Sequence, residues 1–258
     1  MLIKMKRERS HTEDRYLAVW LATAAGLLNA MALGAFGFFP SHMSGNTSQL
    51  SSEVNNSDLR DLTFLGCLLI AFVTGAVTAR LAVIAGLKHN LRTIFCQVLV
   101  AEGIVLLGLS LFEIFFYSSS NNREVLVLLS FLMGVHNSTS TQLSNGRVRA
   151  THITGTLTDA GISFASVLSA MLRRDPSKHA HTQKKQLKTH LTTIFSFLGG
   201  GIVGLWLFRH AGFHAMAALG AVLILLALAS MALTLIKVRG GAMATRRQVL
   251  PQQSKKQG

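Results

Sequence analysis

A short polar motif occurs twice in this chain, and each copy follows the same upstream element. His42-Met43-Ser44-Gly45 returns as His152-Ile153-Thr154-Gly155, which begins 110 residues later (152 − 42). Upstream lie Gly26-Leu27-Leu28-Asn29-Ala30 and Gly134-Val135-His136-Asn137-Ser138, so each half reads Gly-x-x-Asn-small and then His-x-(Ser/Thr)-Gly. An internal repeat of this length is typical of membrane proteins that are assembled from two related halves.

The composition places this repeat in a membrane. Half of the residues (50%) are hydrophobic and only 14% are charged, whereas charged residues make up about 25% of an ordinary soluble domain. Six apolar stretches approach the roughly 20 residues that cross the hydrocarbon core of a bilayer. They are Tyr16–Phe36, Leu62–Leu87, Leu91–Phe116, Val125–Leu143, Leu191–Phe208 and Phe213–Ile236.

The lysines and arginines predict the orientation of these spans. They cluster in both terminal tails and in the loop from Arg173 to His190, and cytoplasmic loops carry such an excess. A seventh apolar stretch, Ile153–Leu172, precedes that loop. If this stretch enters the membrane and returns on the same side, only Arg60, Arg123 and Arg209 lie outside. We therefore predict a re-entrant segment at Ile153–Leu172 and two cytoplasmic termini.

The expected fold class is an all-α membrane protein with six transmembrane helices arranged as two inverted three-helix repeats. Three spans per half is an odd number, so the second half enters the bilayer upside down. The single membrane domain covers 16–237, with repeats at about 16–118 and 123–237, between a basic tail at 1–15 and a basic, disordered tail at 238–258. Each repeat carries a broken or re-entrant helix at its His-x-(Ser/Thr)-Gly motif, and the two motifs meet at a central site.

The motif residues are the candidate solute-binding residues. Glycine tolerates unusual backbone angles, serine or threonine caps a new helix, and the amide groups of such a helix start favour an anion or a carboxylate. A purely structural role, in which these residues only turn the chain, stays open beside ligand contact. The candidates are Asn29, His42, Ser44, Gly45, Asn46, Asn137, His152, Thr154, Gly155 and Thr156.

Two acids in apolar surroundings are candidates for proton or ion coupling. Charged residues within a membrane are costly and usually functional, which singles out Glu102 and Asp159. The structural alternative is an ion pair, such as Arg80 with Glu102.

The remaining patterns argue against other site types. One His per half, without a second ligand four residues later, is weak support for a metal, and we expect no metal and no cofactor. The basic tails and loop attract anionic lipid headgroups rather than nucleic acid. The chain has no Gly-x-Ser-x-Gly elbow and no His-Glu-x-x-His helix, so we expect no enzyme.

These motifs resemble those of the YoaK-like family of bacterial membrane proteins of unknown function, the DUF1275 domain. The resemblance covers residues 15–237 and implies a multi-pass protein of the bacterial inner membrane. It implies no substrate. We expect a small-solute transporter or channel, with a membrane binding or scaffold protein as the alternative and an intramembrane enzyme third. The matching residues are Gly26-x-x-Asn29-Ala30, Ser41 to Thr47, Gly134-x-x-Asn137-Ser138, Arg147-Val148-Arg149 and Thr151 to Asp159.

Overall fold

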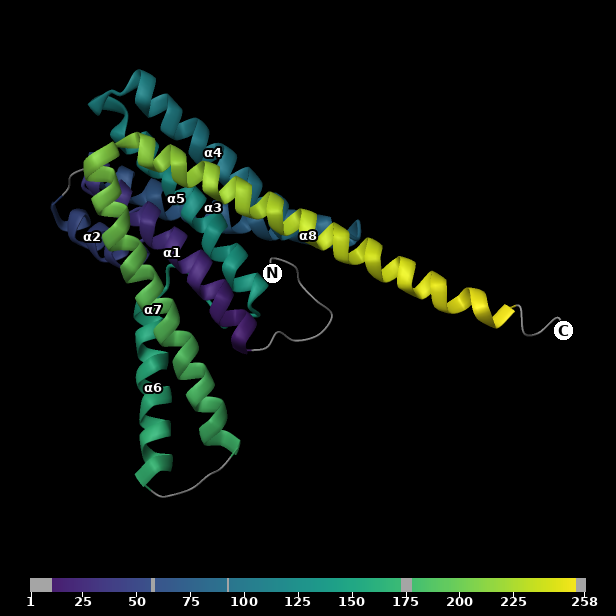
Figure 1. The fold of residues 1–258 in the computed structure, drawn as a ribbon. Helices are drawn as coiled ribbons and strands as arrows, with labels where there is room; N and C mark the ends of the chain where they lie inside the picture. The colour runs from purple at the N-terminus through teal and green to yellow at the C-terminus, as the bar shows by residue number, and fades with distance from the viewer. Residues whose placement is uncertain (1–10, 57–58, 92, 173–177, 254–258) are drawn as a thin grey trace.

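The chain folds into long helices, as the computed structural model in Figure 1 shows. The structure describes residues 11–56, 59–91, 93–172 and 178–253, and within these ranges all regular structure is helical. In lipid this is the expected outcome, because a helix satisfies its own backbone hydrogen bonds. The elements are α1 (His11–Phe36), α2 (Met43–Asn56), α3 (Leu59–Lys88), α4 (Ile94–Phe116), the short η1 (Ser119–Asn121), α5 (Asn122–Leu143), α6 (Ile153–Leu172), α7 (Lys178–Ala211) and α8 (Phe213–Gln253).

The ends of the chain lie partly outside the described ranges. Residues 1–10 and 254–258 of the two predicted tails are not described. The last helix, α8, continues to Gln253, past the predicted end of the membrane domain at residue 237.

Six of the described helices are long and apolar enough to cross a membrane, namely α1, α3, α4, α6, α7 and α8. The chain is therefore a multi-pass membrane protein, but the six differ from the predicted set at two places. The stretch Ile153–Leu172, predicted as a re-entrant segment, forms the continuous helix α6 and is among the six. The predicted span Val125–Leu143 forms α5, which is not among them because the polar run His136–Gln142 lowers its hydropathy. Its 22 residues still cover about 33 Å, and its buried side chains pack against α3, α4 and α1 instead of lipid.

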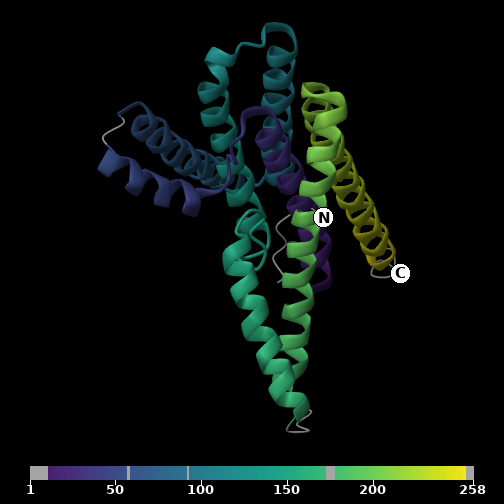
Figure 2. The same cartoon turned by 90° about the vertical axis from the view of Figure 1, so that its left-hand side faces the viewer.

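Each of the three main helix pairs joins one helix of the first half to one helix of the second half. α1 packs along α7, α3 packs along α5, and α4 packs along α8. The α3–α5 pair is parallel, because Asp61 bonds Arg123 near one end and Arg80 bonds Gln142 near the other. The α6–α7 hairpin projects from the helical body, and α2 with α3 forms a second projecting hairpin (Figure 2).

Glycines at equivalent places allow close approach within the α1–α7 pair and within the α3–α5 pair. A Cβ on Gly26 of α1 would lie 2.1 Å from the carbonyl oxygen of Phe197 in α7, and a Cβ on Gly134 of α5 would lie 2.0 Å from that of Phe72 in α3. Gly134 follows Gly26 by 108 residues (134 − 26), and Phe197 follows Phe72 by 125 (197 − 72). Small residues permit such backbone contact between membrane helices, and the α3–α5 contact repeats the α1–α7 contact.

The third pair, α4 with α8, is antiparallel and crosses on two glycines. A Cβ on Gly103 would lie 2.9 Å from the Gly220 carbonyl oxygen, and a Cβ on Gly220 would lie 3.0 Å from the Gly103 carbonyl oxygen. In the same way, Gly103 faces the backbone nitrogen of Ile224 and Gly220 faces that of Leu107. Gly220 follows Gly103 by 117 residues, and Ile224 follows Leu107 by the same number (220 − 103 and 224 − 107). α4 and α8 are therefore counterparts of each other.

Aromatic rings gather where several helices end. The ring of Phe213, at the start of α8, lies 5.8 Å from that of Phe36, 5.8 Å from that of Tyr117 and 5.4 Å from that of Phe208, measured between centroids. These partners come from the end of α1, the residue after α4 and the last turn of α7. We call this side of the molecule the Phe213 end.

Candidate functional site

In the first half, an asparagine inside α1 holds the chain that leads to the motif. After α1 ends at Phe36, the irregular stretch 37–42 turns back along the helix. The backbone N–H and the hydroxyl of Ser41 both donate to Oδ1 of the buried Asn29, at 3.2 Å and 2.7 Å. Asn29 lies seven residues before Phe36 (36 − 29), which is about 10 Å along the helix. The motif at His42 therefore starts well inside the end of α1.

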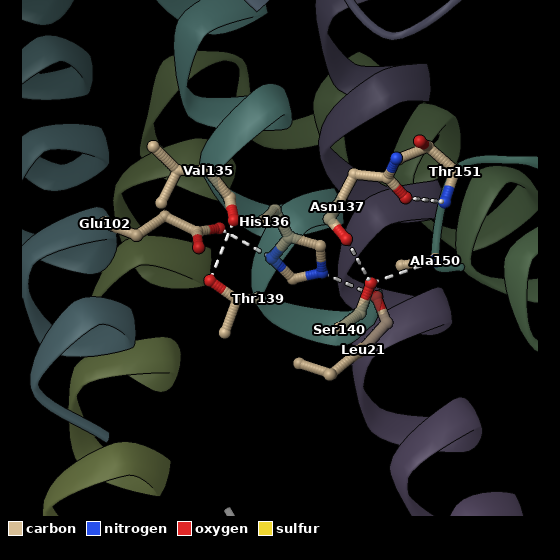
Figure 3. A network of polar contacts seen from close by, with 9 residues as sticks. All are labelled: Leu21, Glu102, Val135, His136, Asn137, Thr139, Ser140, Ala150 and Thr151. Carbon is tan, nitrogen blue, oxygen red and sulfur yellow. Dashed lines mark hydrogen bonds and ion pairs between the residues drawn. The ribbon is translucent and has the colours of Figure 1, made fainter. Parts of the chain in front are cut away.

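The second half repeats this arrangement. The stretch 144–152 turns back along the last turns of α5, where the N–H of Ala150 donates to Ser140 Oγ at 3.2 Å and the N–H of Thr151 donates to Asn137 Oδ1 at 3.4 Å (Figure 3). Asn137 thus accepts a hydrogen bond from the returning chain in the second half, as Asn29 does in the first. In both halves an irregular stretch leads inward along one helix, and a new helix, α2 or α6, then leads away from that point. The predicted helix break lies before each motif, and α6 itself is continuous.

Each motif glycine makes room for the motif histidine. A Cβ on Gly45 would lie 2.0 Å from Cδ2 of the His42 ring, and a Cβ on Gly155 would lie 2.2 Å from Nε2 of His152. Both glycines lie in the first helical turn and neither has a positive φ, so the predicted role of glycine in bending the chain is wrong.

The predicted capping role is wrong as well. Ser44 and Thr154 are the second residues of α2 and α6, one position past the start, where a side chain no longer caps the helix.

Exposure separates the motif residues into two groups. His42, Ser44, His152 and Thr154 are exposed in both halves, whereas Asn46 and Thr156, four residues after each histidine, are buried. The Thr156 hydroxyl donates to the carbonyl oxygen of His152 at 2.8 Å, and Nδ2 of Asn46 is buried without a partner.

The helices that follow the two motifs pack in different places. Within the described ranges α2 contacts α3 and α6 contacts α7, but α2 and α6 do not touch each other. Each new helix packs along the long helix that follows it in the chain, and the central site built from both motifs stays a prediction. The exposed Asp159 on α6 is also separate from Glu102, since α4 and α6 do not touch.

A buried pair of ionisable groups lies between α4, α5 and α1 instead. Glu102 Oε1 lies 2.7 Å from Nδ1 of His136, and Nε2 of His136 lies 2.9 Å from the carbonyl oxygen of Leu21 (Figure 3). Both ionisable side chains are 1% exposed. The alternative pairing of Glu102 with Arg80 is wrong: Arg80 is exposed and donates to Oε1 of Gln142 at 2.9 Å.

Sequence reasoning did not single out His136 as the partner of Glu102. The signal available was its place at the start of the polar run His136–Gln142 in an apolar chain. Within the described ranges, no three His, Cys, Asp or Glu residues gather as metal ligands.

The contacts of His136 require one proton between the imidazole and the carboxyl. A carbonyl oxygen only accepts, so Nε2 must donate its hydrogen to Leu21. The contact between Nδ1 and Glu102 Oε1 then needs a second hydrogen, held either by an imidazolium next to a carboxylate or by a carboxylic acid next to a neutral imidazole. The other carboxyl oxygen, Oε2 of Glu102, is buried without a partner. The pair is therefore a proton-binding site with one unused acceptor.

The counterpart positions of Glu102 and His136, one in each half, carry leucines. With the offset of 117 residues between α4 and α8, Glu102 corresponds to Leu219, and with the offset of 108 between α1 and α5, His136 corresponds to Leu28. Both leucines are buried in the apolar core. Replacing a buried ion pair by hydrophobic residues of similar size is often neutral or stabilising. Leucines are thus accommodated at both counterpart positions, which argues that packing alone does not require the ion pair.

The helices and their polar interior define a multi-pass α-helical membrane protein. Over residues 17–229 the chain matches the family described as "Protein of unknown function (DUF1275)". This match covers most of the chain, which therefore belongs to the DUF1275 family. No curated protein and no solved structure matches the chain significantly.

Proposed function

We propose that this protein moves a small solute across a membrane, and that the Glu102–His136 pair takes up and releases the proton that drives the movement. The observation that carries the proposal is the contact between Nδ1 of His136 and Oε1 of Glu102, which exists only while one proton is bound. An imidazole changes its charge near neutral pH, and ionisable groups inside a membrane usually belong to ion or proton pathways.

Loss of this proton would change how the helices pack. The contact would then hold two acceptors, a carboxylate oxygen and an imidazole lone pair, at 2.7 Å without a hydrogen between them. They would separate, and α4 would lose this link to α5. α4 also forms the glycine crossing with α8, so a shift of α4 would reach both halves of the molecule. A proton that binds one arrangement better than the other shifts the balance between them.

We further propose that the two halves are inverted across a bacterial inner membrane, with both termini cytoplasmic and the Phe213 end outside. The antiparallel crossing of α4 and α8 supports this, because counterpart helices that run in opposite directions belong to halves of opposite orientation. The motif stretches would then enter from opposite faces, 37–42 from outside and 144–152 from inside. Lys184, Lys185 and Lys188 near the start of α7 would lie next to the anionic headgroups of the inner face.

The buried charges indicate the class of solute. In the described part of the chain, the fully buried ionisable side chains besides the cysteine are Glu102, Glu113 and His136, with no lysine or arginine among them. An anion would find no lysine or arginine there, and His136 already faces the Glu102 carboxyl, so we favour a neutral or cationic solute, moved without chemical change. A cavity of about 150 Å³ between α1, α4 and α8 is lined by Leu21, whose carbonyl oxygen contacts His136, and by Leu99, three residues before Glu102. The exposed motif side chains stay predicted contacts of the solute.

The test uses purified protein in lipid vesicles and a panel of small neutral and cationic solutes. We expect uptake of at least one solute to rise when a pH gradient is imposed, and to lose this response in Glu102→Gln. Glu124→Gln is the matched control, because Glu124 is exposed on α5, and it should behave like the wild type. Gradient-driven uptake that survives Glu102→Gln would refute the role of the pair. A panel without any response would favour the scaffold alternative.

A further inference from the structure

A second carboxyl group, that of Glu113, is buried in α4 and takes no part in the pair. The residue is 2% exposed, and neither of its carboxyl oxygens has a hydrogen-bond partner. An isolated carboxylate in apolar surroundings is far less stable than the neutral acid. In this arrangement Glu113 therefore holds a proton.

Glu113 lies on the same face of α4 as Glu102. The two are separated by eleven residues (113 − 102), which is close to three helical turns and about 16 Å. Leu106 and Ser110 lie between them on this buried face, and the Ser110 hydroxyl donates to the Leu106 carbonyl oxygen at 2.7 Å. The carboxyl groups of Glu102 and Glu113 thus lie at the two ends of one row of buried side chains on α4.

The position of Glu113 along α4 is close to one surface of the membrane. The helix ends three residues later at Phe116, and Phe115, Phe116 and Tyr117 are all exposed. Exposed aromatic rings at the end of a span are typical of the membrane–water interface. Tyr117 also contacts Phe213, so Glu113 lies about one turn inside the Phe213 end.

In the part of the chain that the structure describes, no charged side chain bonds to the Glu113 carboxyl. The helices packed against α4 are α3, α5 and α8, and none of their described side chains bonds to Glu113. Arg123 is paired with Asp61, Arg80 with Gln142 and His136 with Glu102. The other titratable side chains that the structure describes on these helices are Arg60, Cys67, Lys88, Glu124 and His214. The counterpart of Glu113 in α8 is Ser230 (113 + 117), so the second half does not require an acid there.

We propose that Glu113 is a second proton-binding site, which passes protons between the Phe213 end and Glu102. A proton from water at that end binds the Glu113 carboxylate. Once the Glu102–His136 pair has released its own proton, the Glu113 acid passes its proton along this face of α4 to the pair. Nothing is oxidised or reduced, and the carboxylate of Glu113 is regenerated. The relay rests on the proposed function, whereas the bound proton does not.

The test for the bound proton is dicyclohexylcarbodiimide, which adds to protonated carboxyl groups in apolar surroundings and leaves an N-acylurea on the side chain. The purified protein in lipid vesicles is treated with it, and peptides are mapped by mass spectrometry. We expect the adduct on Glu113, less of it as the pH rises, and none on Glu53 or Glu124, which are more exposed. Glu113 without an adduct at any pH would refute the second site.

The test for the relay is proton flux under a pH gradient, followed with a dye inside the vesicles. Glu113→Ser is the main variant, because the counterpart position carries serine and its packing is tolerated there, and Glu113→Gln is the second. We expect both variants to fold and to lose most of the flux. Full flux in both would refute the relay. Labelled Glu113 in a wild-type protein that shows no flux would instead contradict the proposed function and leave the second proton site standing.

Discussion

Replacing His136 by leucine tests whether the buried pair is needed for folding. The variant leaves the Glu102 carboxyl, 1% exposed, without its partner, and breaking a buried pair from one side costs about 3–5 kcal/mol. Adding Glu102→Leu removes the stranded carboxyl and recreates the leucines found at Leu28 and Leu219. Replacing both members of a pair is often neutral or stabilising by about 1–4 kcal/mol, so the double variant should be at least as stable as the wild type.

The measurement is a double-mutant cycle of unfolding free energies, with the four proteins purified in the same detergent and lipid. Neighbouring residues that interact give a coupling free energy that differs clearly from zero. We expect both single variants to unfold more easily and the double variant to recover. A double variant that is destabilised by the sum of the two single losses would refute the reasoning, because leucines would then not be tolerated at positions 102 and 136 as they are at Leu219 and Leu28.

Three further substitutions test the packing of the two halves. Gly134→Ala places a methyl group 2.0 Å from a carbonyl oxygen of α3 and should abolish the monodisperse peak in size-exclusion chromatography. The control Gly66→Ala, whose methyl group meets nothing within 4 Å, should leave that peak unchanged. Asn29→Ala leaves two donors of the motif stretch unpaired and should lower the unfolding free energy by about 1–3 kcal/mol, and an unchanged value would contradict the anchoring role. Arg123→Ala removes a half-exposed pair with Asp61 and should change stability by no more than about 1 kcal/mol, which thermal unfolding can check.

The sequence was sufficient to predict the membrane class and to locate the two motifs and their asparagines, although the anchoring role of the asparagines was not predicted. Hydropathy reports composition, and the doubled Gly-x-x-Asn element appears directly in the residues. Gly26 and Gly134 are small because two backbones meet there, and Asn29 and Asn137 are amides because each must accept from a returning chain. Each of these requirements concerns a single contact, so it can be recognised from the residue type at that position.

The pairing of the halves could not be predicted in the same way. Whether α2 and α6 meet depends on which long helices they pack along, and no residue of either motif encodes that choice. Glu102 stands out as an acid in an apolar stretch, but its partner depends on the register of α4 against α5. The hydropathy of α5 is misleading, because protein and not lipid surrounds it.

The most direct test of the account is proton movement by the double variant Glu102→Leu with His136→Leu. Wild-type protein in vesicles that contain a pH-sensitive dye should dissipate an imposed pH gradient when solute is present. The double variant should fold with wild-type stability and leave the gradient intact, because its core then resembles that of Leu28 and Leu219. A folded double variant that moves protons as fast as the wild type would contradict the claim that the pair serves function and not packing.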